Sequence, residues 1–185
     1  MITDHEKIEL WLDRYYIRKY TIRPDGVVDV NGDVSMRDVT ESILPIQFGK
    51  VTGNFDCHMV PITSLKGFPH TVLGDVYAAY TKISSLEYAP QFVGGGFYCH
   101  NTNIKSLHGV DKMIKHIGND FLCDNDGLTH VLGLLLIEGL TDIRLGGKDA
   151  PRHTAAIMNK YRGTGDILSA QDELIDAGFI DQARL

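Results

Sequence analysis

A segment of the sequence recurs every 21 residues, and this periodicity constrains the fold more than any other feature. The segment 51–57, VTGNFDC, returns 21 residues later as 72–78, VLGDVYA, and again as 93–99, VGGGFYC. The same shift backward along the chain reaches 30–36, VNGDVSM. A further unit begins at Ile117 with a displacement of 24 residues, which places a three-residue insertion near 111–116. Fixed periods of about 20–50 residues are typical of repeat architectures.

Each unit has the pattern of a short strand with one buried face. Apolar residues occupy Val51, Phe55 and Cys57, and polar residues lie between them. Gly53 precedes Phe55 by two residues and suits a tight backbone bend. One such coil cannot bury its apolar face alone, whereas stacked coils bury a continuous strip and pair their strands in parallel. We therefore predict an α+β protein built on a short parallel β-solenoid of about five coils of 21–24 residues. In the rival fold, a mixed α/β sandwich, the strict register would be a coincidence.

The N-terminal segment, 1–29, is predicted to cap the solenoid with a helix and a hairpin. Thr3 to Glu6 fits a capping box at the start of the helix. Apolar residues follow at helical spacing and predict a face packed on the first coil: Ile8, Trp11, Leu12 and Tyr15. The hairpin pairs 20–22 with 28–30 around the turn Pro24-Asp-Gly26.

The solenoid is expected to span 30–147, and a helical hairpin over 148–185 is expected to cap its other end. The segment 134–145 reads as a last strand or two. Pro151 is placed to open a helix that runs to about Tyr161. Asp166 is expected to cap a second helix, which ends at Gly178. The residues of that helix expected to face inward are Ile167, Ala170, Leu174 and Ile175.

Composition favours a globular protein with free thiols. The chain has 185 residues and an apolar fraction of 43%, which excludes a disordered chain and a fibrous repeat, and its net charge of −6 argues against extensive coverage by nucleic acid. Cys57, Cys99 and Cys123 share one repeat position with Met36 and Ala78, so we expect them in the core. We expect a cytoplasmic protein without a targeting signal or a membrane segment, since the longest apolar run is 131–137.

The repeat units resemble leucine-rich-repeat-like proteins of tailed bacteriophages. The resemblance rests on VTGNFDCHMVPITSLKGFP (51–69) and VGGGFYCHNTNIKSLHGV (93–110). The segments YTIRPDGVVDVNGDV (20–34) and GDILSAQDELIDAGF (165–179) resemble the ends of that group. The sequence departs from the pattern at Ala78, which replaces cysteine, and at Tyr88, which replaces glycine. The resemblance implies a leucine-rich-repeat-like solenoid, encoded by a phage and acting in the cytoplasm of a bacterial host, and it implies no specific reaction.

Strand alternation defines a candidate partner surface. Residues on either side of an inward-facing residue point outward, and stacked coils align them into one face. Tyrosine, histidine and arginine on one face have the composition of a recognition surface, although a solvated sheet face is the alternative. The candidate partner-binding residues are Arg37, Asp56, His58, Tyr77, Tyr98 and His100.

We therefore expect a non-enzymatic protein-interaction module that binds and modulates or inhibits a host bacterial protein. The resemblance suggests a host protein of transcription, metabolism or defence. One alternative is a nucleic-acid-associated protein, because basic and aromatic residues interleave in 14–23. Its candidate binding residues are Arg14, Arg18, Lys19 and Arg23. Another alternative is a module that sequesters a small anionic ligand.

No motif in the sequence predicts catalysis, a cofactor or a metal site. Gly94 to Gly96 has neither the lysine of a P-loop nor the helix of a dinucleotide fingerprint after it. The segment 124–127, DNDG, is not followed by the glutamate of a calcium loop. His58 and His100 lie two coils apart, which is too far for one metal ion or a shared proton.

Overall fold

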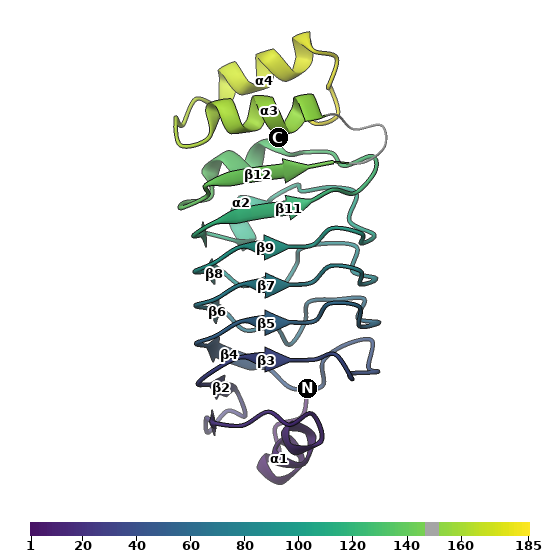
Figure 1. The fold of residues 1–185 in the computed structure, drawn as a ribbon, viewed down its shortest axis with the longest axis vertical. Helices are drawn as coiled ribbons and strands as arrows, with labels where there is room; N and C mark the ends of the chain where they lie inside the picture. Colours follow the sequence, from purple (N-terminus) through teal and green to yellow (C-terminus); the bar gives the residue numbers. More distant parts are fainter. Residues whose placement is uncertain (147–151) are drawn as a thin grey trace.

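The structure is a computed structural model that describes residues 1–146 and 152–185. The chain forms a stack of coils with helices at both ends (Figure 1). Two sheets of six strands run along the stack, and all their strand pairs are parallel except the N-terminal hairpin. The predicted parallel β-solenoid is confirmed. It has about six coils rather than five, because the last strand lacks the Val-x-Gly motif on which the count was based.

Sheet A runs along one side of the coils. Its strands, in spatial order, are β1 (Tyr20–Ile22), β2 (Val28–Val30), β4 (Phe48–Val51), β6 (Thr71–Val72), β8 (Phe92–Val93) and β10 (His116–Ile117). Sheet B faces the viewer in Figure 1 and carries one strand per coil. Its strands are β3 (Val34–Ser35), β5 (Phe55–Asp56), β7 (Val76–Tyr77), β9 (Phe97–Tyr98), β11 (Asp120–Cys123) and β12 (Asp142–Leu145).

Each repeat unit contributes two strands, so the prediction of a single strand was wrong. Val51 ends β4 in sheet A, and Phe55 begins β5 in sheet B. Between them the chain bends at Gly53, where a Cβ atom would lie 2.1 Å from Asp33 Oδ1 and 2.7 Å from Asp33 N. The close approach of the preceding coil therefore requires glycine and interrupts the alternation.

A relay of side-chain hydrogen bonds joins the coils at this bend. Asp33 Oδ1 accepts a bond from Asn54 N at 2.7 Å, and Asn54 Oδ1 accepts one from Asp75 N at 2.8 Å. Asp75 Oδ1 then accepts a bond from Gly96 N at 2.7 Å. Each bond spans 21 residues, which matches the repeat length seen in the sequence.

The space between the two sheets is filled by apolar side chains. Phe48 of sheet A packs against Phe55 of sheet B with ring centroids 5.3 Å apart. The three thiols are buried in the same core, as predicted. Burial raises the pKa of Cys57 and Cys99, because an apolar interior disfavours the thiolate.

The N-terminal cap is a helix, α1 (His5–Arg14), followed by the antiparallel β1–β2 hairpin. Its predicted apolar stripe is buried. The predicted start at Thr3 was wrong by one residue: Asp4 is the N-cap, and its carboxylate accepts the Lys7 N–H at 3.1 Å. Glu41, from the loop after β3, joins the cap to the solenoid by accepting hydrogen bonds from Trp11 Nε1 at 3.1 Å and Tyr15 OH at 2.9 Å.

The three residues inserted before the unit that begins at Ile117 accompany a short helix, α2 (Val110–Met113). The predicted strands of 134–145 were partly wrong, because 3₁₀ helix η1 (Leu132–Leu136) precedes β12. Leucine at four of five positions around Gly133 suits a buried turn between α2 and the final helices. Only 142–145 form a strand there.

Two helices, α3 (Arg152–Tyr161) and α4 (Ile167–Asp176), cover the C-terminal end (Figure 1). Asp166 caps α4 as predicted, and Gly178 follows it with φ +85°. Ile175 was expected to face inward, but it is 45% exposed, so this prediction was wrong. The buried residues of α4 are Ala170 and Leu174. Pro151 and the boundary at 147–148 lie outside the described residues. No helix in the described ranges has the length and apolar character needed to span a membrane.

Asn159 of α3 closes the free edge of sheet B. Its Oδ1 accepts the Ile143 N–H at 2.9 Å, and its Nδ2 donates to the Ile143 carbonyl at 2.8 Å. The side-chain amide thus makes, at the centre of β12, the bonds that another strand would make.

Candidate recognition surface

Three of the six predicted partner-binding residues lie on strands of sheet B, and Arg37, His58 and His100 each follow such a strand by two positions. On these strands Phe55, Val76 and Phe97 are fully buried, whereas Asp56, Tyr77 and Tyr98 are half-buried with outward-facing side chains. The predicted alternation is therefore confirmed within these strands, but it was wrong just beyond β7, where Ala79 was expected to face outward and is buried. We call this surface the recognition face. It consists of Arg37, Asp56, His58, Tyr77, Tyr98 and His100, together with Tyr80.

Tyr77 and Tyr98 form a stacked pair on adjacent strands. Their ring centroids lie 5.2 Å apart with 12° between the ring planes. Tyr77 OH donates to Asp75 Oδ2 at 2.9 Å, and this bond to a carboxylate raises the pKa of Tyr77 to about 12. Tyr98 lies back over Gly96, where a Cβ atom would be 2.5 Å from the Tyr98 hydroxyl. Each ring therefore lies over the residue two positions before it, and Tyr77 is also hydrogen-bonded to that residue.

Tyr80 lies between the two histidines of the face and was missed by the sequence prediction. Its ring centroid is 5.2 Å from that of His58 and 5.4 Å from that of His100, with edge-on geometry in both pairs. Tyr80 is 53% exposed and has φ +56°, a conformation that costs a non-glycine residue about 1–2 kcal/mol. The equivalent residues Met59 and Asn101 also have positive φ. These three residues occupy the same position in successive units, and this spacing of 21 residues was the signal in the sequence that could have identified Tyr80.

Charged groups border the aromatic residues at both ends. Arg37 Nε donates to Asp56 Oδ2 at 3.1 Å near the first coil. At the other end Arg144, which pairs in register with Leu122, bonds Asp120 at 2.9 Å and Asp142 at 2.8 Å. The sequence did not place Arg144 beside the aromatic residues, because β12 has no repeat motif.

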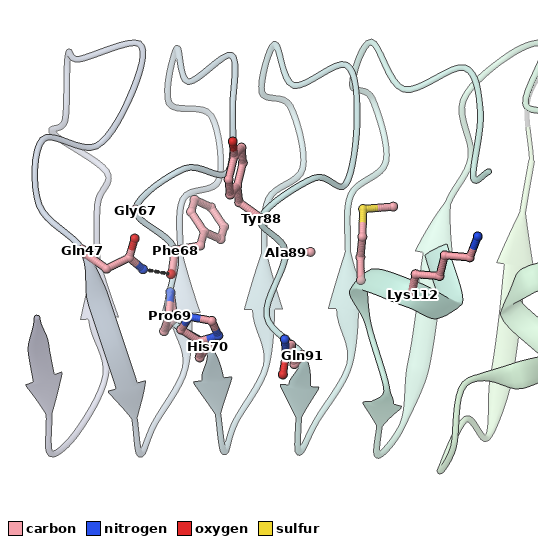
Figure 2. Close-up of a pocket in the computed structure, with 10 residues that line it drawn as sticks. Gln47, Gly67, Phe68, Pro69, His70, Tyr88, Ala89, Gln91 and Lys112 are labelled. Carbon is pink, nitrogen blue, oxygen red and sulfur yellow. Dashed lines mark hydrogen bonds between the residues drawn. The ribbon is translucent and has the colours of Figure 1, made fainter. Parts of the chain in front are cut away.

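A groove of about 490 Å³ opens on the recognition face at the first coils. Tyr77 forms one wall, and Asp56 and His58 lie in the next coil toward the N-terminus. A smaller hollow of about 260 Å³ lies among the turns that precede sheet A (Figure 2). There Gln47 Nε2 donates to the Phe68 carbonyl at 2.6 Å, and Tyr88 lines the hollow. The smaller hollow contains no carboxylate side chain.

The four residues proposed for nucleic-acid binding lie in the N-terminal cap, away from the recognition face. Arg18 forms an ion pair with Asp13, and Arg23 binds both carboxylate oxygens of Asp29 at 2.8 Å. The guanidinium of Arg14 lies 5.4 Å from the Tyr15 ring centroid. Lys19 is exposed on the connection to β1. Two of these cations are thus already paired with carboxylates.

In the segment 124–127, which was compared with a calcium loop, Asn125 has a structural role. Asn125 is buried, and its amide bridges two coils through Thr102 and the Ile104 carbonyl. Among the residues that the structure describes, no group of three histidine, cysteine or acidic side chains could hold a metal ion.

Comparison of the chain with protein-family models, with the curated proteins and with the solved structures returns no significant match.

Proposed function

We propose that this protein is a non-enzymatic interaction module whose recognition face binds another protein. The observation that carries the proposal is the ordered aromatic array on the exposed side of sheet B. Tyr77 and Tyr98 stack with 12° between their planes, and Tyr80 packs against His58 and His100. Aromatic residues held in place before binding lose little conformational entropy when a partner covers them.

The strained backbone at Tyr80 supports the same proposal. A large apolar ring at positive φ, exposed by 53%, adds little to the stability of the free protein. Backbone strain tends to gather where binding or catalysis needs a particular geometry. At this position the Tyr80 ring packs against both histidines on the outer surface.

The partner we propose is a bacterial host protein, which this chain modulates or inhibits. That part of the proposal depends on the resemblance to leucine-rich-repeat-like proteins of tailed phages, as do phage origin, action in the host cytoplasm and a role in host takeover or anti-defence. The parallel solenoid is compatible with that family, since both stack short repeat units into an extended surface.

The two alternatives have less support. Carboxylates already pair with Arg18 and Arg23, which weakens the case for a nucleic-acid surface in the N-terminal cap. A small anionic ligand would meet Asp33 and Asp56 in the groove on the recognition face.

The test compares two tyrosines that lie on different surfaces but have the same exposure and a similar backbone conformation. Tyr80 and Tyr88 are each 53% exposed, and each has positive φ. Tyr80 belongs to the recognition face, whereas Tyr88 lines the hollow beside sheet A. The wild-type chain is used to capture partners from host cells, and each candidate is purified and measured directly. Tyr80→Ala and Tyr98→Ala should each weaken its binding by about 1–3 kcal/mol, and Tyr88→Ala should leave it unchanged.

Folding controls separate loss of the surface from loss of the fold. Tyr98→Ala should leave the melting temperature nearly unchanged, whereas Phe97→Ala should destabilise the protein by about 3 kcal/mol or more because Phe97 is fully buried. If every captured protein binds the Tyr80 and Tyr98 variants as tightly as the wild type, the recognition face is not the interface.

A further inference from the structure

The groove on the recognition face begins where the tyrosine stack ends. Tyr98 covers one side of the Tyr77 ring, and the opposite side of that ring borders the groove. The register partner of Tyr77 in the next coil is Asp56, and that of Asp56 is Ser35. Neither residue has a ring, so the row of tyrosines stops at Tyr77.

The groove occupies the place that further tyrosine rings would fill. Tyr98 leans over Gly96 and Tyr77 is bonded to Asp75, so each ring lies above its own residue and the one two positions earlier. In the next coil these positions are Asn54 and Asp56, and in the first coil they are Asp33 and Ser35. All four of these residues line the groove. A planar group seated there would extend the stack on the free side of Tyr77.

The charge of the groove favours a cation. Asp33, Asp56 and Arg37 are its charged lining residues, apart from His58, so its carboxylates outnumber its permanent cations. Arg37 already bonds Asp56, but its side chain is 72% exposed and lies at the rim. Asp33 takes part in no ion pair among the described residues, and it uses Oδ1 in the relay to Asn54. Its charge is left for a ligand to neutralise.

We infer that this groove receives the guanidinium of an arginine side chain of the protein partner, stacked on Tyr77 and hydrogen-bonded to the carboxylates. The inference depends on the proposed function, because it identifies the partner group that the recognition face anchors. A guanidinium is planar, carries a full charge and offers five donors. It can stack on an aromatic ring and bind a carboxylate at once. A lysine ammonium lacks the plane, a nucleotide brings phosphates toward aspartates, and an apolar ring would cover the Asp33 carboxylate without neutralising its charge.

The inference is tested with a small probe on the full chain. Nα-acetyl-arginine methylamide is titrated while the tyrosine ring resonances are followed by NMR, and Nα-acetyl-lysine methylamide serves as the matched cation. The arginine probe should shift the Tyr77 resonances saturably and bind about fivefold more tightly than the lysine probe, because only the guanidinium combines stacking with forked hydrogen bonds.

Two variants address the two halves of the site. Tyr77→Leu removes the stacking surface and should weaken the arginine probe about fivefold. Asp33→Asn removes the charge but keeps an amide oxygen for the Asn54 N–H, as Asn54 itself does for Asp75. It should weaken the arginine probe severalfold with an unchanged melting temperature. Tyr88→Leu, outside the groove, should have no effect on the probe.

Several results would overturn the arginine site. Equal affinities for the arginine and lysine probes would mean that the groove attracts any cation. Tighter binding of adenosine monophosphate than of the arginine probe would assign the groove to a nucleobase. If the arginine probe fails while partner binding still depends on Tyr80 and Tyr98, the recognition face stands and the arginine anchor is wrong.

Discussion

Tyr77 and Tyr98 occupy the same repeat position but differ in what holds them. Tyr77 is tied through its hydroxyl to the Asp75 carboxylate, whereas Tyr98 lies over a glycine that has no side chain. Asp75 therefore serves two purposes: Oδ1 continues the relay to Gly96, and Oδ2 orients the Tyr77 ring. A single residue thus links the bend that joins the coils to the surface proposed for binding.

Tyr77 should ionise at a higher pH than an ordinary tyrosine. The hydrogen bond to Asp75, burial and the nearby carboxylate charge together raise the pKa of Tyr77 to about 12. Asp75→Asn removes the charge but keeps a carbonyl oxygen for the Gly96 N–H, so it should lower the pKa of Tyr77 toward 10. An NMR titration of ring-labelled tyrosine in both proteins measures the difference. An unchanged pKa in the variant would show that Asp75 does not hold the Tyr77 hydroxyl.

Which residues point outward could be predicted from the sequence, but how they are held could not. Alternation alone placed Tyr98 outside and Phe97 inside. Tyr80 was missed because backbone conformation decides its direction, and tyrosine gives no sign of positive φ. The relay residues Asp33, Asn54 and Asp75 stand at a visible spacing of 21. Their role depends on how closely two backbones approach, which composition does not reveal.

At the scale of elements, the first helix is joined to the solenoid through one carboxylate. Glu41 accepts hydrogen bonds from Trp11, Tyr15 and its own neighbour Thr40 N. Burial opposes the ionisation of Glu41, but these hydrogen bonds outweigh it, and the pKa of Glu41 is lowered. The N-terminal cap therefore depends on a charged Glu41.

Replacing Glu41 should loosen the cap and change how stability varies with pH. Glu41→Ala leaves the Trp11 N–H and the Tyr15 hydroxyl without their acceptor, at a cost of about 1–3 kcal/mol. Because the pKa of Glu41 is lower in the folded state, its contribution is complete above the ordinary glutamate value of 4.5 and is lost as the pH falls further. Urea unfolding from pH 7 downward measures both effects.

The free energy of unfolding should depend on pH differently in the wild type and in Glu41→Ala. Below pH 4.5 the wild type should lose more stability than Glu41→Ala, because the variant has no such carboxylate left to protonate. Glu138→Ala removes an exposed glutamate far from the cap and should follow the wild type. Parallel pH curves for the wild type and Glu41→Ala would contradict this role of Glu41.

Elements with strong local signals were predicted well, and those shaped by neighbouring coils were not. The β1–β2 hairpin and the Asp166 cap of α4 follow from turn and cap residues that act locally. The division of each unit into two strands follows instead from the approach of Asp33 to Gly53. Likewise, η1 replaces a predicted strand because α2 and α4 pack against it.

At the scale of the whole molecule, the three thiols report on the integrity of the stack. Cys57, Cys99 and Cys123 are completely buried, and burial raises the pKa of the first two. Reaction with a thiol reagent requires an exposed thiolate, so it should be slow in the native protein and fast in denaturant. Labelling followed by mass spectrometry measures each site. Rapid native labelling of all three cysteines would contradict a closed core.

The relay from Asp33 to Gly96 joins four successive units through one hydrogen bond at each step. In each of these three bonds, 21 residues separate the side-chain oxygen from the N–H that it accepts. Gly96 has no side-chain oxygen to offer onward. The following unit is displaced by 24 residues, and its excess length is absorbed beside α2. The relay therefore ties the first four units together at one spacing, and the units beyond Gly96 are joined without it.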